Sequence, residues 1–201
     1  MDISGKEKEF ALIGTILSLL TIIPYIGGLF AIIGLVLLLI SIYNYSNKIF
    51  NDKNLFNKFL IGWICNVVGV VFAFVVGVFS FIPLLLSSGS GAEDAMLGMA
   101  GLGIIFAVFI VYASFIVSFY FYKESFVLLA KYTNINLFNL AGNILYWGSI
   151  AIAAFGLGFI AIYIGWIILA FAFYSIPPSS QLISQKSSEI QQKENESQVK
   201  N

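Results

Sequence analysis

The side chains in this sequence that could do chemistry are few, and most of them lie inside apolar stretches. Asn66 and Asn143 are the most polar residues within the long apolar runs, and Cys65 is the single cysteine. Glu93 and Asp94 are adjacent acids in the stretch SSGSGAEDAM. An amide in hydrocarbon needs a hydrogen-bond partner, a cysteine thiolate is a nucleophile, and neighbouring acids can transfer protons. The last two chemistries depend on supporting groups nearby.

The supporting groups for catalysis are missing from the sequence. The chain has no histidine, the commonest general base and metal ligand, and no arginine, the planar clamp for phosphate. Cys65 has no cationic neighbour in GWICNVV to stabilise a thiolate. Glu93 and Asp94 fit the start of a helix, where the helix dipole favours acids. We therefore expect no enzyme, no catalytic residue, no cofactor and no metal site.

The elements that carry these residues must be solvated by lipid. Of the 201 residues, 60% are hydrophobic and 10% are charged, whereas a soluble domain has roughly 25% charged residues. Such a chain cannot cover its surface with groups that water solvates. Ten acids balance ten bases, and this absence of net charge argues against a nucleic-acid partner. The expected surroundings are the lipid bilayer of the cell (cytoplasmic) membrane.

Four long apolar runs make up most of the chain, and each outer run is broken at its centre. The runs are 10–45, 59–86, 95–122 and 137–176. A bilayer core of about 30 Å takes about 20 helical residues, so each outer run has the length of two short helices. Pro24, Gly27 and Gly28 interrupt the first run, and Gly156 and Gly158 interrupt the last.

Proline and glycine at these points favour a tight reversal, since proline lacks an amide donor and glycine tolerates a positive φ. We therefore predict an all-α fold, a polytopic transmembrane helical bundle with six spans arranged as three helical hairpins. The spans are expected at about 10–23, 29–45, 59–82, 99–122, 137–154 and 159–176.

The lysines predict on which side of the membrane the spans begin and end. With six spans, all ten lysines fall on one side, and the opposite side has none. The lysine-bearing segments are 1–9, 46–58, 123–136 and 177–201. Short lysine-rich segments stay in the cytoplasm, so both termini are expected there (N-in and C-in). A re-entrant hairpin in either outer run would give the same sidedness.

The polar parts of the chain are expected at the cytoplasmic surface. Residues 1–176 form the predicted membrane domain, and 177–201 a disordered polar cytoplasmic tail rich in Ser, Gln, Lys and Glu. The first residues mix acids with lysines, and we expect them to be retained rather than cleaved as a signal peptide. Segment 46–58 mixes apolar residues with lysines, which predicts a short amphipathic helix along the membrane surface.

Small and polar residues inside the spans are expected to hold the helices together. Small residues recur at helical spacing, as over Gly27–Gly34, and allow helices to approach closely. Asn66 and Asn143 are the expected intramembrane polar contacts; they could bond to each other, or to Thr15 or Ser18, and we favour a structural role over contact with a substrate. No Asp, Glu, Lys, Arg or His lies in the middle of a span, which argues against a proton- or ion-coupled transporter.

The sequence FALIGTILSLLTIIPYIGGLFAIIGLVLLLISIYNYS, followed by IFNDKNLFNKFLIGWI, resembles an integral membrane family known as domain of unknown function 996, found mainly in archaea. The matching features are the opening I-G-x-I-L, the P-x-I-G-G turn, the I-I-G-L-x-L helix and the N-x-L-F-x-x-F-L re-entry. These are packing and turn motifs. The resemblance therefore implies a membrane fold and brings no activity or ligand with it.

Two functions fit these observations. The first is a non-catalytic structural or accessory component of the membrane, acting through a homo-oligomer or a membrane-protein partner. The alternative is a small facilitator or channel for an uncharged or lipid-like solute, with the region of Asn66 and Asn143 as its polar site. A third and more distant function, an enzyme acting on lipid, would need Glu93 or Asp94 to be essential.

Overall fold

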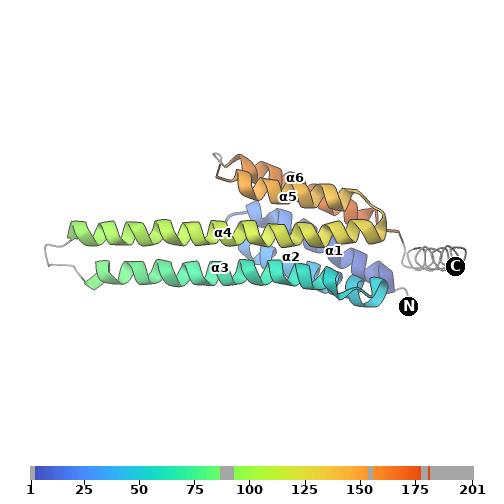
Figure 1. The fold of residues 1–201 in the computed structure, drawn as a ribbon, viewed down its shortest axis with the longest axis horizontal. Helices are drawn as coiled ribbons and strands as arrows, with labels where there is room; N and C mark the ends of the chain where they lie inside the picture. Colours follow the sequence, from blue (N-terminus) through green and yellow to red (C-terminus); the bar gives the residue numbers. More distant parts are fainter. Residues whose placement is uncertain (1–2, 87–92, 154–155, 178–180, 182–201) are drawn as a thin grey trace, which may run out of the picture.

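The chain folds into three helical hairpins that pack side by side (Figure 1). The computed structural model describes residues 3–86, 93–153, 156–177 and 181, and their regular structure is all helical, which confirms the predicted all-α class. The elements are α1 (Ile3–Leu19), the short 3-10 helix η1 (Leu20–Ile22), α2 (Gly27–Asn44), the π-helical turn η2 (Tyr45–Phe50), α3 (Lys53–Leu86), α4 (Glu93–Thr133), α5 (Leu137–Ala151) and α6 (Leu157–Tyr174). Within the bundle α4 also packs against α5, and α1 against α6.

The middle hairpin is much longer than the spans predicted for it. Helix α3 has 34 residues and α4 has 41, which at about 1.5 Å per residue gives lengths of roughly 51 and 61 Å. Helix α4 continues past Tyr122, through the stretch predicted as a connection, because its later turns bury Phe126 and Leu129 in the core. The Ser125 hydroxyl also donates a hydrogen bond to the Leu55 carbonyl, over 3.0 Å.

Segment 46–58 is not the separate surface helix that the sequence predicts. Its first residues continue α2 as η2, and its last belong to the first turns of α3. Between them Asn51 takes the left-handed conformation, with φ 49°. Phe50 and Leu55 are buried, so the apolar side chains of this segment pack into the protein core rather than into lipid.

The first hairpin turns at Pro24, but its glycines do not supply the reversal as expected. The positive φ falls on Tyr25, at 69°, while Gly27 and Gly28 are the first residues of α2. At Gly27 a Cβ atom would lie 2.3 Å from the Thr21 carbonyl oxygen, whereas at Gly28 it would meet nothing within 4 Å. A close approach of the backbone therefore requires glycine at position 27, whereas no contact within the described chain requires it at position 28.

The glycines of the third hairpin have two separate roles. Gly156 precedes α6 with φ 76°, a conformation that strongly favours glycine. Gly158 lies inside α6, where an added Cβ would be 2.1 Å from the Gly148 carbonyl oxygen. One glycine makes the turn and the other lets α5 and α6 touch. Residues 154–155 between the helices lie outside the described part of the chain.

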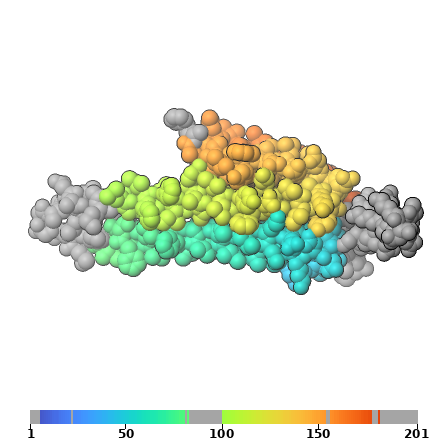
Figure 2. Space-filling view, in the orientation of Figure 1, coloured from blue at the N-terminus to red at the C-terminus, as the bar shows by residue number. Residues whose placement is uncertain are grey.

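The outer part of the α3–α4 hairpin projects beyond the other two hairpins (Figures 1 and 2). The Tyr112 hydroxyl of α4 donates to the Ile150 carbonyl near the end of α5, over 2.7 Å. Helix α4 begins 19 residues earlier, at Glu93, which corresponds to roughly 28 Å of helix. The side chains on this projection are large, apolar and exposed, such as Phe79 (66%), Leu102 (68%) and Ile105 (67%).

Four of the helical segments are long and apolar enough to cross a membrane. They are Gly27–Phe50, Lys53–Ser80, Ala100–Thr133 and Leu157–Tyr174. Helices α1 and α5, with 17 and 15 residues, are shorter than these segments. The membrane location is thus supported by four apolar helices, and the arrangement of six complete spans stays a prediction. The predicted tail, 177–201, lies outside the described residues apart from Pro177 and Gln181.

Candidate functional site: an apolar groove beside a polar cavity

A cavity of about 280 Å³ lies where the three hairpins meet. Six elements line it: α1 and η1 contribute hydroxyls, α2 contributes aliphatic side chains, α3 contributes Asn66, and α4 and α6 contribute mainly aromatic rings. The lining residues are Ser18, Thr21, Ala31, Leu35, Asn66, Phe115, Phe119, Tyr122, Phe159, Ile162, Tyr163 and Trp166. The described lining carries amide, hydroxyl and indole groups but no charged side chain. Most of the lining is apolar, and we call this space the polar cavity because of its few uncharged polar groups.

Two polar groups beside this cavity have no partner among the described residues. The side chain of Asn66 makes no hydrogen bond there. The Tyr122 hydroxyl is buried and also unpartnered, and the whole residue is only 2% exposed. An unpaired amide or hydroxyl in apolar surroundings costs free energy. The cavity is thus one of the places in the described structure where hydrogen-bonding capacity is left over; the buried Glu7 Oε2 and Tyr45 hydroxyl, which lie away from it, are others.

A short chain of hydroxyl groups forms another part of the cavity wall. The Thr21 hydroxyl donates to the Ser18 carbonyl over 3.0 Å and lies 3.3 Å from the Tyr163 hydroxyl. Because the single proton of Thr21 is used by Ser18, Tyr163 is the donor in the second contact. The oxygen of Tyr163 then keeps lone pairs that can accept a hydrogen bond.

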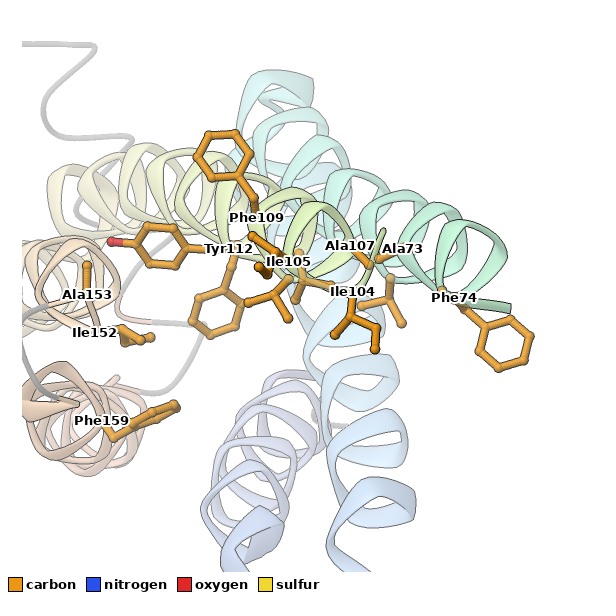
Figure 3. A pocket seen from close by; sticks show the side chains of 15 residues that line it. Ala73, Phe74, Ile104, Ile105, Ala107, Phe109, Tyr112, Ile152, Ala153 and Phe159 are labelled. Atoms are coloured by element: carbon orange, nitrogen blue, oxygen red, sulfur yellow. The ribbon is translucent and has the colours of Figure 1, made fainter. Parts of the chain in front are cut away.

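An apolar groove of about 1060 Å³ runs along α3 and α4 below the tip of the α5–α6 hairpin (Figure 3). Its walls are aliphatic and aromatic: Val70, Ala73, Phe74, Gly77, Ile104, Ile105, Ala107, Val108, Phe109, Val111, Tyr112, Phe115, Ile152, Ala153 and Phe159. The hydroxyl of Tyr112, the most polar side chain in this set, is already bonded to Ile150. The groove therefore offers apolar contact and almost nothing to hydrogen bond with.

The groove and the polar cavity adjoin each other. Phe115 of α4 and Phe159 of α6 line both spaces. In Figure 3 the ring of Phe159 reaches from α6 toward the residues of α4 across the groove. A molecule with an apolar body and a polar end could therefore occupy both spaces at once.

The two asparagines predicted as intramembrane contacts have different surroundings. Asn143 donates to the carbonyl and to the side-chain oxygen of Asn139, at 2.9 and 3.0 Å, within α5. It is not among the residues lining the cavity. Asn66 and Asn143 thus do not bond to each other. Thr15 and Ser18, the other expected partners, bond to carbonyls of their own helix, Ala11 and Gly14.

Charged side chains of the described chain gather at the opposite end from the projection. Lys58 pairs with Glu124 over 2.7 Å, and Lys48 lies 3.8 Å from buried Glu7. The Lys8 ammonium donates to the Ile176 carbonyl over 3.0 Å. The first two contacts each lie within one hairpin, and the third joins α1 to the residues that follow α6. No group of three or more potential metal ligands occurs in the described residues, and Cys65 is free and half-buried.

Sequence reasoning identified Asn66 but missed the residues that accompany it. Tyr122 and Tyr163 are tyrosines in apolar runs, where an aromatic ring signals packing as often as binding. Trp166, only 9% exposed, lines the same cavity from α6. The Tyr122 ring packs against Phe59, with centroids 4.8 Å apart. The spacing of Tyr163 and Trp166, three residues apart in a helix, was the available signal that they share a face.

Comparison with known proteins gives two matches. The family model described as "Protein of unknown function (DUF996)" matches residues 30–167. The "Uncharacterized protein MJ1644" of Methanocaldococcus jannaschii is 31% identical over 182 residues, which cover 87% of this chain and 96% of that protein. No solved structure matches the chain. Neither description names an activity or a ligand.

Proposed function

The chain belongs to the DUF996 family of proteins of unknown function, and we propose that it is a non-catalytic integral membrane protein that binds a lipid-like molecule. Because the family description names no activity, the proposal rests on the geometry of the chain itself. The observation that carries this proposal is the groove below the α5–α6 tip. It has a volume of about 1060 Å³, near the upper end of the range of roughly 300–1,000 Å³ for ligand pockets. Hydrocarbon fills such a space without leaving polar groups unsatisfied, whereas water would find almost no partners.

The surroundings of the groove also suit a lipid. Phe74 and Phe109 at its margins are 71% and 64% exposed, and the projecting parts of α3 and α4 beside it are apolar on their outer faces. In a bilayer these faces contact acyl chains, so a lipid can enter the groove sideways without crossing water. The proposal takes its non-catalytic character from the missing histidine and arginine, and its ligand from the size and apolarity of the groove.

A continuous polar path, which a facilitator or channel would need, has less support. Asn66 and Asn143 were its two polar positions, and Asn143 is engaged with Asn139. The role of an accessory component that works through a second copy of the chain remains the competing function, because a second copy could cover the same apolar face.

The groove predicts a matched pair of variants. Ala107→Trp places a large ring among the lining residues, whereas Phe106→Trp changes a neighbouring side chain that is 57% exposed and outside the groove. Native mass spectrometry of protein extracted gently from its own membranes is expected to show a retained lipid-like molecule on the wild type and on Phe106→Trp. On Ala107→Trp we expect retention to fall at least about tenfold, since the ring occupies the space of the chain.

Equal retention by both variants and the wild type would contradict the proposal. So would a stable homodimer without lipid whose subunits cross-link through cysteines placed at groove positions, because the second copy would then be the occupant. Both variants should elute as single species, as a check that the added ring has not unfolded the bundle.

We further propose that both termini lie in the cytoplasm and that the two shorter hairpins enter and leave the membrane on that side. The described lysines, Lys6, Lys8, Lys48, Lys53, Lys58, Lys123 and Lys131, lie on the segments that meet at one end of the bundle, as the positive-inside rule favours. Glu124 is a charged residue of α4, and Tyr112 of the same helix lies level with the end of α5, where it bonds to Ile150. The stretch of α4 between these two residues is about 18 Å long. This is less than the roughly 30 Å of a bilayer core.

Backbone bonding in the first hairpin turn is compatible with a tip that stays in lipid. The amides of Ile23, Ile26 and Gly27 donate to carbonyls of the turn, at 3.1, 2.9 and 2.8 Å, and Pro24 has no amide hydrogen. A lipid-exposed turn must satisfy its polar groups internally. The α3–α4 hairpin is then the one that crosses the whole bilayer.

Cysteine labelling tests this topology. In a Cys65→Ala background, Ser90→Cys, in the connection between α3 and α4, is expected to react with a membrane-impermeant maleimide added outside intact cells. Tyr25→Cys, at the fully exposed tip of the first hairpin, is expected to react only after detergent extraction. Reaction of Tyr25→Cys on intact cells would show that the first hairpin also crosses the whole bilayer, and failure of Ser90→Cys to react there would overturn the orientation.

A further inference from the structure

We infer that the molecule in the groove carries an uncharged hydroxyl head, and that Asn66 binds this head in the polar cavity. The inference rests on the proposed function and adds the chemical class of the ligand to it: a long-chain alcohol, with its hydrocarbon chain in the groove. It is carried by the juxtaposition of the two spaces: the groove is almost purely apolar, and the cavity beside it contains the unpartnered amide of Asn66.

Asn66 brings the largest unused hydrogen-bonding capacity to the cavity. Its amide has two donor hydrogens and one acceptor oxygen, and none of them is used within the described chain. Asn66 is half-buried, and in a chain surrounded by lipid an amide without a partner is destabilising. A hydroxyl oxygen that accepts from the Asn66 amide resolves this cost.

Tyr163, another residue of the cavity wall, can use the hydroxyl hydrogen of the ligand. Tyr163 donates to Thr21, which leaves the Tyr163 oxygen as an acceptor. A hydroxyl is both donor and acceptor, so it can accept from Asn66 and donate to Tyr163 or back to the Asn66 oxygen. A ligand without a polar end would leave the Asn66 amide without a partner and the Tyr163 acceptor unused.

The absence of charge around the cavity excludes an ionic head. No charged side chain is among its described lining residues. The charged groups at the near end of α4 are already engaged: Glu124 pairs with Lys58 at 2.7 Å, and the Lys123 ammonium lies 5.1 Å from the Tyr146 ring. A phosphate or ammonium head in this cavity would be desolvated without a counter-charge, which is strongly unfavourable.

The chain of such a ligand has a direct route. From the Asn66 level the hydrocarbon passes Phe115 and Phe159, which border both spaces, and continues along α3 to Gly77. These 11 residues of helix span about 16 Å, the scale of a long alkyl chain. The head therefore lies inside the bundle and the tail points toward the projecting part of α3 and α4.

The test uses Trp166 as a reporter, because it lines the cavity. The chain has three tryptophans, so Trp63→Phe and Trp147→Phe leave Trp166 as the sole emitter. In detergent micelles, hexadecanol is expected to change its fluorescence saturably, and hexadecane to bind about tenfold more weakly, as expected for the loss of about one hydrogen bond. In Asn66→Leu, the affinity for hexadecanol should fall to that for hexadecane.

Two further variants separate a specific effect from a structural one. Asn66→Gln keeps the amide and is expected to restore part of the preference for hexadecanol. Asn143→Leu removes the other intramembrane asparagine, which lies outside the cavity, and is expected to leave binding unchanged. If Asn66→Leu binds hexadecanol as tightly as the wild type, or if hexadecyl sulfate binds better than hexadecanol, the inference is wrong.

The outcomes also distinguish this inference from the function on which it rests. Equal binding of hexadecanol and hexadecane, both weakened by Ala107→Trp, would leave the groove as a lipid site and overturn the assigned head group. Absence of saturable binding for either probe, with no lipid retained from native membranes, would overturn both.

Discussion

Replacing Gly34 with leucine is expected to prevent the chain from accumulating as folded protein. Helices α1 and α2 touch here through their backbones: an added Cβ at Gly34 would lie 2.6 Å from the Gly14 carbonyl oxygen, and one at Gly14 would lie 2.7 Å from the Gly34 carbonyl oxygen. Neither backbone can move away without separating the two helices. The expected cost exceeds about 3 kcal/mol, against a total stability of roughly 5–15 kcal/mol for a typical domain.

Gly28→Leu is the matched control for this prediction. It is the same substitution in the same helix, at a position where an added Cβ meets nothing within 4 Å, and it is expected to be tolerated. The measurement is the fraction of expressed protein that elutes as a single species in mild detergent. A folded Gly34→Leu variant with the wild-type melting temperature would contradict the packing described here, and an unfolded Gly28→Leu variant would show that leucine is harmful for another reason.

The contact at Gly34 was partly predictable from the sequence. Small residues at helical spacing predicted a close helix contact on this face of α2, and the structure has one there. Which helix makes the contact could not be read from the pattern, because every apolar run carries similar small residues. The left-handed turn residue was also unpredictable: local propensity favours glycine, but the chain places Tyr25 there, since Gly27 is held by its approach to Thr21.

Hydropathy predicted the class of fold better than it predicted the lengths of the helices. Lys123 and Glu124 ended the apolar run, and the span was expected to end with it. The helix continues because the next turns bury Phe126 and Leu129 against the protein, a tertiary contact that no local pattern reveals. The candidate site has the same character: Asn66 stood out by its polarity, but its neighbours Tyr163 and Trp166 come from a helix about 100 residues away and are apolar enough to pass as packing.

Asp52 lies in the short connection before α3 and bonds to residues of α3, α4 and η2 at the charged end of the bundle. One carboxylate oxygen accepts a hydrogen bond from the backbone N–H of Asn54, over 2.9 Å, and so caps the start of α3. The other accepts from the Tyr132 hydroxyl near the end of α4. The Asp52 carbonyl accepts from the Ser46 hydroxyl at 2.5 Å, which joins the end of α2 to the same point. Three helices thus depend on one residue in a short connection.

Asp52→Ala is therefore expected to destabilise the bundle by about 2–4 kcal/mol. Loss of the cap contributes about 1 kcal/mol, and loss of a hydrogen bond to a charged acceptor about 1.5–3 kcal/mol. For a chain of this length the melting temperature in detergent should fall by roughly 5–15 °C. Tyr132→Phe removes only the second bond and should cost less, and the double variant should be less destabilised than the sum, because the two residues share that bond. If Asp52→Ala melts within about 2 °C of the wild type, the junction does not depend on Asp52; if the two substitutions are additive, the Tyr132 contact contributes nothing to stability.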